Sequence, residues 1–248
     1  MTRTFILGDG GLGRAIEAAF IARAGTDHGG EVAVLGRPRS GRHEPSSLDG
    51  VDLLIEASRG DEVVPNLAAG LEAGARWAVI ATTGWNEHRA TVESLLREYG
   101  AAAVASSNFS LGVALFGRLV ESAVELFGPL EGFDPYLLEW HRRGKRDRPS
   151  GTALDLGRRI VAGHPRLASP DDLEVVSVRA GASPGMHLVG FDAAGETVEL
   201  RLTARDRSAY ATGILAAADW LQRVPREPGL HPFDSIVDEL IARDPVAA

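Results

Sequence analysis

The stretch TFILGDGGLGRAIEAAFIARAG, residues 4–25, decides how this chain folds. It opens with a short apolar run typical of a buried strand and closes with residues that favour a helix. Between them, Gly8-Asp9-Gly10-Gly11-Leu12-Gly13 has the spacing G-x-G-x-x-G. Such glycines allow a tight turn and a close approach of the backbone to a pyrophosphate at the helix N-terminus. The stretch predicts a dinucleotide-binding strand–loop–helix unit, and the alternative is a purely structural turn.

Strands and helices continue to alternate after this unit. Apolar runs predict strands over residues 31–35, 51–58, 77–82 and 101–106, and helical patterns cover 62–75 and 86–100. Strands that alternate with helices imply parallel βαβ units with helices on both faces of one sheet. We therefore predict an α/β fold whose N-terminal domain is a Rossmann-type parallel sheet.

The pattern changes in the second half of the chain. Helical patterns cover residues 110–128 and 150–163, and strand patterns cover 133–141, 173–181, 185–192 and 197–205. In the last strand apolar and polar residues alternate, which is typical of an antiparallel strand with one wet face or one interface face. Helices follow over 208–224 and from about residue 234. These elements predict a second, α+β domain with a mixed or antiparallel sheet.

Composition excludes several classes of protein. A formal net charge of −8 over 248 residues argues against a general nucleic-acid binder. The sequence has no cysteine, which excludes disulfides, thiolate metal ligands and a cysteine nucleophile, and we predict no metal site. The first apolar run lacks the flanks of a signal peptide, and no run approaches the length of a membrane span. We expect a cytoplasmic protein with no membrane partner.

The residues after the second predicted strand bear on the choice of cofactor. An acidic residue there would hold a ribose 2′-hydroxyl, but the sequence reads Leu35-Gly36-Arg37-Pro38-Arg39-Ser40, and the next acid is Glu44. Guanidinium groups pair well with phosphate oxygens, so Arg37, Arg39 and Ser40 suit a 2′-phosphate. We predict NADPH as the preferred cofactor, with Arg37 as a ligand, and NADH as the other candidate. The alternative is a solvated basic loop.

Small, mostly polar residues follow the fourth and fifth predicted strands. They are Ala81, Thr82, Thr83, Ser106, Ser107 and Asn108, with Phe109 next in the chain. In an open α/β sheet, ligands bind beyond the carboxyl ends of the strands. We predict that these residues contact the nicotinamide or its ribose, and the alternative is ordinary turn and capping chemistry.

Residues 141–152 read HRRGKRDRPSGT, a local charge of about +4 in an acidic chain. His141 ends a predicted strand and Lys145 lies in the following loop, so both are candidates for proton transfer. A helix begins at Ser150-Gly151-Thr152, where backbone N–H groups and hydroxyls can bind an anion. The combination suits a small substrate that carries carboxylates. The alternatives are a surface histidine and a solvated loop.

This stretch, extended to residues 139–153, resembles the signature E-x-H-x-x-x-K-x-D-x-P-S-G-T-A of bacterial 4-hydroxy-tetrahydrodipicolinate (dihydrodipicolinate) reductases. Further matches follow in order: ATTGW (81–85) is similar to G-T-T-G-F, SNFSLGV (107–113) to A-N-F-S-x-G-V, and VRAG with GMH (178–187) to V-R-A-G-x-x-x-G-x-H. The resemblance implies NAD(P)H-dependent reduction of a small dianionic cyclic imine on the route to diaminopimelate and lysine.

The resemblance also implies residue roles and an assembly. His141 and Lys145 form the acid–base pair, and Gly151 and Thr152 hold a substrate carboxylate. The implied domains are a dinucleotide-binding domain over 1–108 and 213–248, and a substrate-binding and oligomerisation domain over 109–212. The second domain's sheet builds a homotetramer.

The chain departs from the family pattern at several places. Arg142 stands where the family usually has a second histidine that touches the substrate, and a permanent cation there could pair with a carboxylate. The glycine loop is G-x-G-x-x-G instead of G-x-x-G-x-x-G, and residues 57–60 replace F-T-x-P. The segment before Val178 lacks the family's glycine- and arginine-bearing loop. These differences leave two alternatives: a paralogous reductase of another cyclic imine in specialised metabolism, and a non-catalytic NADP-binding protein.

Overall fold

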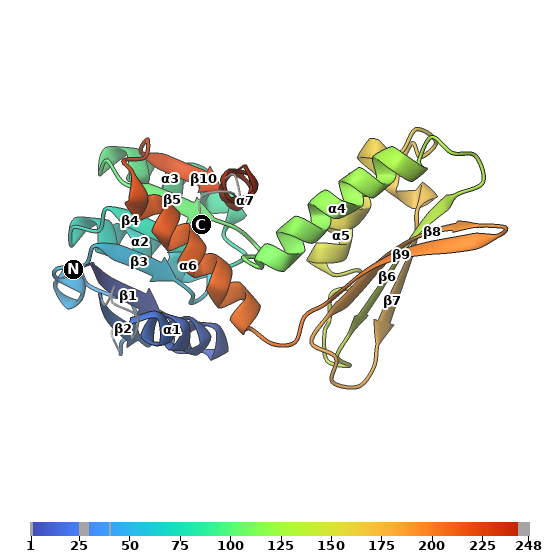
Figure 1. Cartoon of the computed structure of the whole chain (residues 1–248). Coiled ribbons are helices and arrows are strands. Elements are labelled where there is room, and N and C mark those ends of the chain that lie inside the picture. The colour runs from blue at the N-terminus through green and yellow to red at the C-terminus, as the bar shows by residue number, and fades with distance from the viewer. Residues whose placement is uncertain (1, 25–29, 40, 243–248) are drawn as a thin grey trace. The chain divides into compact units, whose positions relative to one another are not determined.

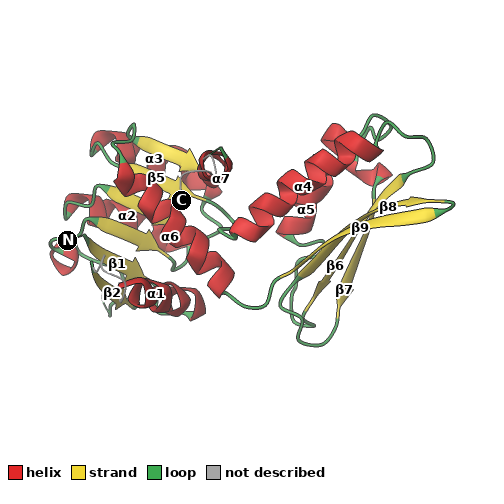
Figure 2. Ribbon diagram, viewed as in Figure 1, coloured by secondary structure: helices red, strands yellow, loops and turns green. Residues whose placement is uncertain are grey.

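The computed structural model describes residues 2–24, 30–39 and 41–242. The chain divides into two compact units. Unit 1 comprises Met1–Leu111 and Arg207–Ala248, and unit 2 comprises Gly112–Asp206. Figure 1 and Figure 2 show the strands and helices of each unit, which are described separately below.

Unit 1 is built on a parallel sheet with the strand order β10-β5-β4-β3-β1-β2 in the described part of the chain. The strands are β1 (Arg3–Leu7), β2 (Glu31–Leu35), β3 (Leu53–Glu56), β4 (Trp77–Ile80), β5 (Ala102–Ala105) and β10 (Gly229–Pro232). Every neighbouring pair is parallel. The apolar runs form strands because a central parallel strand is covered on both faces, and β3 is buried along its whole length. The predicted Rossmann-type sheet is confirmed.

Helices cover both faces of this sheet. They are α1 (Gly11–Ala24), α2 (Val63–Glu72), α3 (Arg89–Glu98), α6 (Ser208–Arg223) and α7 (Phe233–Ile241), with 3-10 turns η1 (Pro45–Leu48), η2 (Gly60–Glu62) and η3 (Asn86–His88). α1 and α6 pack together on one face, and α2 and α3 pack together on the other (Figure 1). Leu54, Leu67, Ile80 and Leu96 belong to the core between the sheet and the second helix pair.

The strand β10 is absent from the sequence-based prediction. Its residues GLHP show neither alternation nor a β-branched run, so no pattern marks them as a strand. β10 lies at the edge of the sheet, beside β5, where a proline in a strand is tolerated. β10 therefore pairs with β5 because α6 packs on the sheet and brings the following residues to its edge, which is a tertiary effect.

Unit 2 packs two helices on a mixed sheet with the order β7-β6-β8-β9 among the described residues. The elements are α4 (Leu111–Phe127), which begins at the end of unit 1, β6 (Asp134–His141), α5 (Gly151–Gly163), η4 (Pro170–Asp172), β7 (Glu174–Arg179), β8 (Met186–Ala193) and β9 (Glu196–Thr203). β6 pairs in parallel with β7 and antiparallel with β8, and β8 pairs antiparallel with β9. The predicted mixed sheet is confirmed.

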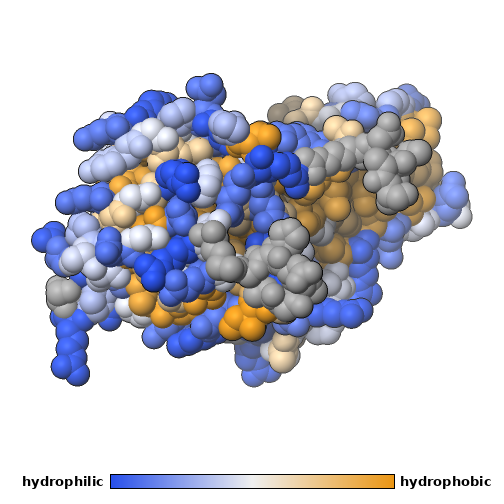
Figure 3. All heavy atoms as spheres, turned by 60° about the vertical axis from the view of Figure 1, so that its left-hand side comes forward, coloured by the Kyte–Doolittle hydropathy of each residue, from blue (hydrophilic) through white to orange (hydrophobic). Residues whose placement is uncertain are grey.

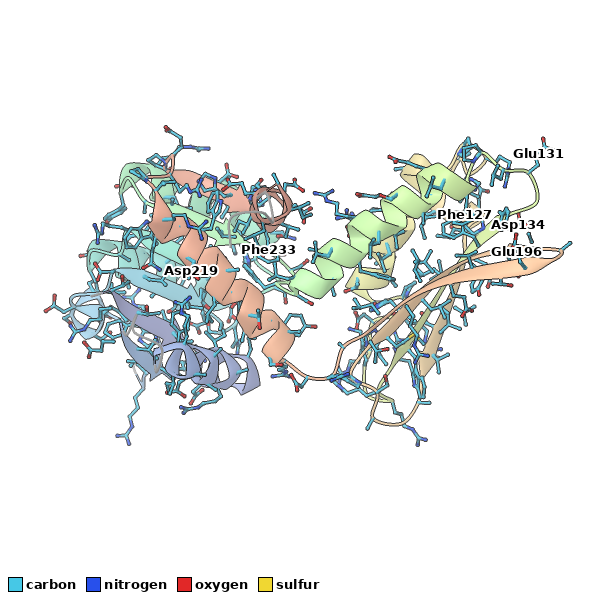
Figure 4. All side chains as sticks on the ribbon, viewed as in Figure 1. Phe127, Glu131, Asp134, Glu196, Asp219 and Phe233 are labelled. Atoms are coloured by element: carbon cyan, nitrogen blue, oxygen red, sulfur yellow. The ribbon has the colours of Figure 1, made fainter. Side chains whose placement is uncertain are left out.

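One face of this sheet forms the core of unit 2. Val120, Leu137, Ile160 and Phe191 pack there between the sheet and the helices. Phe127, labelled at the end of α4 in Figure 4, stacks on Phe191 with ring centroids 5.0 Å apart. Residues that alternate with Leu137 along β6 therefore point away from the core.

Figure 3 shows hydrophilic residues over much of the face turned to the viewer, with apolar areas between them. Among the described residues, no helix is both long enough and apolar enough to cross a membrane.

Candidate active site

A cavity of about 650 Å³ opens at the carboxyl edge of the sheet in unit 1. Its walls come from the glycine loop and from the segments after β3, β4 and β5, with one side of α6. The lining residues are Gly10, Gly11, Leu12, Ala57, Ser58, Arg59, Gly60, Asp61, Ala81, Thr82, Thr83, Ser107, Phe109, Arg207, Tyr210 and Ile214. The fold thus brings the predicted glycine loop together with the polar residues that follow β4 and β5.

The glycines of the loop meet the steric demands of a phosphate cradle. Gly8 has a φ of 120°, and a Cβ there would lie 2.4 Å from the Ala57 carbonyl oxygen. A Cβ on Gly13 would lie 1.8 Å from the Gly8 oxygen, so both positions require glycine. No atom lies within 4 Å of the Cβ position at Gly10, which leaves that backbone open. The residues present therefore fit a dinucleotide whose pyrophosphate lies at the N-terminus of α1.

Arg207 and Tyr210 are cavity residues that the sequence reasoning missed. A Cβ on Gly11 would lie 2.3 Å from Arg207 Nη1, so this guanidinium lies directly against the glycine loop. Arg207 precedes the first turn of α6 and is far from the loop in sequence. No local pattern links the two segments, because their contact depends on α6 packing beside α1.

Glu56, at the end of β3, fixes part of the cavity wall. Its side chain is fully buried and accepts hydrogen bonds from the Ser58 backbone N–H at 2.8 Å and from Thr82 Oγ1 at 3.1 Å. The Ser58 hydroxyl donates to this same oxygen, Oε1, and Asn66 Nδ2 donates to the other oxygen, Oε2, at 2.8 Å. Burial raises the pKa of Glu56, although these hydrogen bonds act in the opposite direction. The network orients Ser58 and Thr82, which both line the cavity.

Two of the predicted cofactor residues engage their side chains in local turns. Ser106 Oγ donates to the Asn108 carbonyl oxygen at 2.9 Å, and Asn108 Oδ1 accepts from the Ser110 N–H at 2.9 Å. Phe109 is buried against Phe233, with ring centroids 4.9 Å apart. Phe233 is labelled at the start of α7 in Figure 4. This segment supports the cavity wall through Phe109 and exposes Ser107.

A second cavity of about 200 Å³ adjoins the first and shares Gly10, Ala57, Ser58 and Arg59 with it. Its other lining residues are Gly8, Asp9, Arg37, Pro38, His43, Glu62 and Asn66. Arg37 is anchored at its rim, because Nη2 pairs with Glu62 Oε1 at 2.8 Å and Nε donates to the Gly41 carbonyl oxygen at 3.2 Å. Arg39 is exposed, and Ser40 lies outside the described residues.

In unit 2, strand register gathers a cluster of charged and polar side chains. Glu139 and His141 are two residues apart on β6, so both point to the same face of the sheet. The antiparallel strand β8 places His187 opposite Glu139. The parallel strand β7 places Ser177 opposite Glu139 and Arg179 opposite His141. Residues far apart in the chain therefore meet at one end of the sheet.

The carboxylate of Glu139 is the centre of this cluster and is fully buried. Oε1 accepts hydrogen bonds from Arg179 Nη2 at 2.6 Å, Ser177 Oγ at 2.6 Å and the Ser150 N–H at 3.0 Å. Burial alone would raise the pKa of Glu139, but these donors outweigh it and lower the pKa to about 2. The carboxylate is thus ionised at neutral pH.

The second carboxylate oxygen faces two histidines. Glu139 Oε2 lies 3.2 Å from His141 Nε2 and 3.8 Å from His187 Nε2. The other ring nitrogen of His141, Nδ1, lies 3.3 Å from the Pro184 carbonyl oxygen. Burial lowers the pKa of His141, whereas Glu139 raises it. Burial, followed by the neighbouring His141, lowers the pKa of His187 to about 4, so His187 is neutral at pH 7.

The basic loop and the start of α5 adjoin this cluster. Lys145 is half-buried, with Nζ 2.9 Å from Asp147 Oδ1, and its charge contributes to the lowered pKa of His141. Arg142 is exposed. Ser150 caps α5 by accepting from the Ala153 N–H, and its Oγ lies 3.2 Å from His187 Nε2. The Ser150 hydroxyl therefore makes its contacts within the protein.

The next two residues of α5 have different surroundings. Gly151 is exposed, with no atom within 4 Å of its Cβ position. Thr152 follows it in the first turn of the helix. The helix start therefore has an open backbone at Gly151.

Glu139, Arg179 and His187 lie within the family motifs of the sequence, but no local pattern assigns them a role. The available signal was a charged residue in an otherwise apolar strand, two positions before His141. By spacing alone, Glu139, His141 and His187 could hold a metal ion, because one ligand atom of each lies within 4.8 Å of the others. The Arg179 guanidinium on Oε1 and the basic loop oppose a divalent cation at this place, and the cluster fits an anionic ligand better.

A glycine cradle at the carboxyl edge of a parallel sheet, together with a unit that presents buried histidines beside a basic loop, defines the class: a nicotinamide-dependent oxidoreductase of two units. The family profile described as dihydrodipicolinate reductase, C-terminus, matches residues 112–236. The chain belongs to the dihydrodipicolinate reductase family, which confirms the resemblance seen in the sequence.

Individual relatives agree with this assignment. The 4-hydroxy-tetrahydrodipicolinate reductase of Archaeoglobus fulgidus is 31% identical over 240 residues, which cover 91% of this chain and 90% of that protein. That of Sulfurimonas denitrificans is 32% identical over 208 residues, covering 78% and 79%. The structure of a dipicolinate-bound dihydrodipicolinate reductase from Paenisporosarcina sp. TG-14 covers 95% of this chain and 100% of its own, with a TM-score of 0.69 and 19% identity. That last likeness shows a shared fold.

Proposed function

We propose that this protein reduces 4-hydroxy-tetrahydrodipicolinate with NADPH, on the route to diaminopimelate and lysine in the cytoplasm. The observation that carries the proposal is the cluster around Glu139 and His141, set beside a basic loop and the open start of α5, in a member of this family. A buried pair of imidazoles next to cationic side chains suits proton transfer to a small dianion.

The residues of unit 1 would hold the cofactor, which supplies the hydride when bound. Gly10 offers open backbone at the start of α1, where a pyrophosphate is favoured, and the Arg207 guanidinium lies against the neighbouring Gly11. Thr82 and Thr83 line the cavity after β4 and would contact the nicotinamide end. Arg37 stands at the rim of the adjoining cavity as the cation for a 2′-phosphate, which supports NADPH as the preferred cofactor.

The residues of unit 2 would bind the substrate and move a proton. Arg142 and the backbone at Gly151 and Thr152 supply charge and N–H donors to carboxylates. Ser150 acts by capping this helix start. His141 and Lys145 form the acid–base pair, and one of them donates the proton that completes the reduction.

We further propose a homotetramer assembled through the outward face of the unit 2 sheet. Apolar side chains line that face, including Leu138, Trp140, Val176 and Leu188, and the strand register places them side by side. Trp140 is 39% exposed and Val176 is 41% exposed in the single chain. Burying these apolar side chains against a second copy is favourable.

The test of the proposed function is NADPH oxidation with enzymatically generated 4-hydroxy-tetrahydrodipicolinate. Robust turnover that is lost in His141→Ala and in Lys145→Ala is the expected result. Turnover only with other cyclic imino acids would contradict the substrate assignment and indicate a paralogous reductase. Dinucleotide binding without turnover on either substrate class would contradict an enzymatic role.

A further inference from the structure

Asp9, the second residue of the glycine loop, places its carboxylate at the end of β2. The Gly8 N–H donates to the Leu35 carbonyl oxygen at 2.8 Å, which ties the start of the loop to the last residue of β2. A Cβ on Gly36 would lie 2.8 Å from Asp9 Oδ2 and 3.1 Å from its Cγ. The carboxylate therefore occupies the space that a side chain at Gly36 would take.

The end of the second strand is the place where this fold recognises the adenosine ribose. An acidic residue there accepts a hydrogen bond from the ribose 2′-hydroxyl and selects NADH. In this chain Gly36 and Arg37 follow β2, and neither is an acidic residue. The tertiary structure supplies a carboxylate at that place from the glycine loop instead.

Opposite charges meet in the same cavity. Asp9 and Arg37 both line the cavity of about 200 Å³. Among the residues that the structure describes, no ion pair or hydrogen bond engages the Asp9 carboxylate, whereas Arg37 pairs with Glu62. A 2′-phosphate carries a charge of about −1.5 to −2 at neutral pH, so Arg37 attracts it and Asp9 repels it. A 2′-hydroxyl can donate to Asp9 without such a penalty.

We propose that Asp9 is a specificity-determining residue, which accepts a ribose hydroxyl and reduces the preference for NADPH over NADH. The inference rests on the proposed function, in which unit 1 binds a nicotinamide dinucleotide. Asp9 opposes Arg37, and the balance of the two charges sets how far the protein discriminates between the cofactors.

Binding of two unreactive probes, ADP-ribose and 2′-phospho-ADP-ribose, tests the proposal without the reaction. The dissociation constants are measured by titration calorimetry for the full-length wild-type chain, for Asp9→Asn and for Asp9→Ser. Asp9 is exposed, so neither variant disturbs a core. We expect the ratio of the two dissociation constants to shift about tenfold in favour of the 2′-phosphorylated probe in both variants.

Glu44→Gln is the matched control. Glu44 also follows β2 and is exposed, but it does not line either cavity, so its loss of one negative charge leaves the ratio unchanged. An unchanged ratio in the Asp9 variants, or a shift as large in Glu44→Gln, would overturn the inference while leaving the dinucleotide site in place. Failure of the wild-type chain to bind either probe would overturn the proposed function and this inference with it.

Discussion

Replacing His187 by glutamine should make the free energy of unfolding fall less steeply as the pH drops from 7.5 to 5. The folded imidazole has a pKa of about 4, against an ordinary value of 6.5. In the unfolded chain the ring takes up a proton near pH 6.5, and in the folded chain it does so only near pH 4. The unfolded state therefore binds more protons over this window, and stability is lost as the pH falls through it.

The two pKa values determine the size of this effect. Between pH 7.5 and pH 5, the proton uptake of the unfolded ring costs about 2 kcal/mol of unfolding free energy. The side chain of His187 is 7% exposed, so screening by solvent is slight. Glu139 contributes almost nothing over the same range, because its folded pKa is about 2 and its ordinary value is 4.5.

Urea unfolding of the wild type and His187→Gln at pH 7.5, 6 and 5 measures the difference. The two units can unfold separately, so urea unfolding alone does not say which unit is affected. Hydrogen exchange of the β6 and β8 amides should therefore be measured as well, because it reports the stability of unit 2. The wild type should lose about 2 kcal/mol more than the variant between pH 7.5 and 5. Equal losses in the two proteins, or an NMR titration that places the His187 pKa near 6.5, would refute the reasoning.

Three further changes test the site and the assembly. Glu139→Gln should cost about 3 kcal/mol in urea unfolding, because it leaves the buried Arg179 guanidinium without an ionic partner. If His141 is the proposed acid–base residue, the same variant should move one limb of the kcat/KM pH profile to lower pH, because Glu139 raises the pKa of His141. An unmoved limb would indicate a purely structural role for Glu139. Arg37→Ala should weaken NADPH binding by about 1–3 kcal/mol and NADH binding much less, as measured by fluorescence titration, and equal losses would contradict the 2′-phosphate assignment. Trp140→Lys should convert the proposed tetramer into smaller species in sedimentation velocity with an unchanged circular dichroism spectrum, whereas a tetramer that persists would place the interface elsewhere.

Local sequence patterns determined many of the strands and helices of this protein and the faces to which their side chains point. The run from Thr4 to Gly13 specifies a strand, a tight turn and a helix start, because Gly8 adopts a positive φ and a Cβ on Gly13 would collide with the Gly8 oxygen of the same loop. Alternation along β9 predicts which side chains face the core. The spacing of Glu139 and His141 places both on one face of a strand, whatever the strand pairs with.

Tertiary structure alone decided which distant residues complete these features. His187 and Arg179 reach Glu139 through the register of β8 and β7, and register depends on which faces of separate strands are buried together. Arg207 reaches the glycine loop because α6 returns to pack beside α1. Asp9 stands in the sequence as a loop residue, yet its carboxylate lies at the end of β2, where the sequence itself has only Gly36. A pattern read along the chain reports local conformation and burial, whereas the partners of each side chain are decided when separate segments pack against each other.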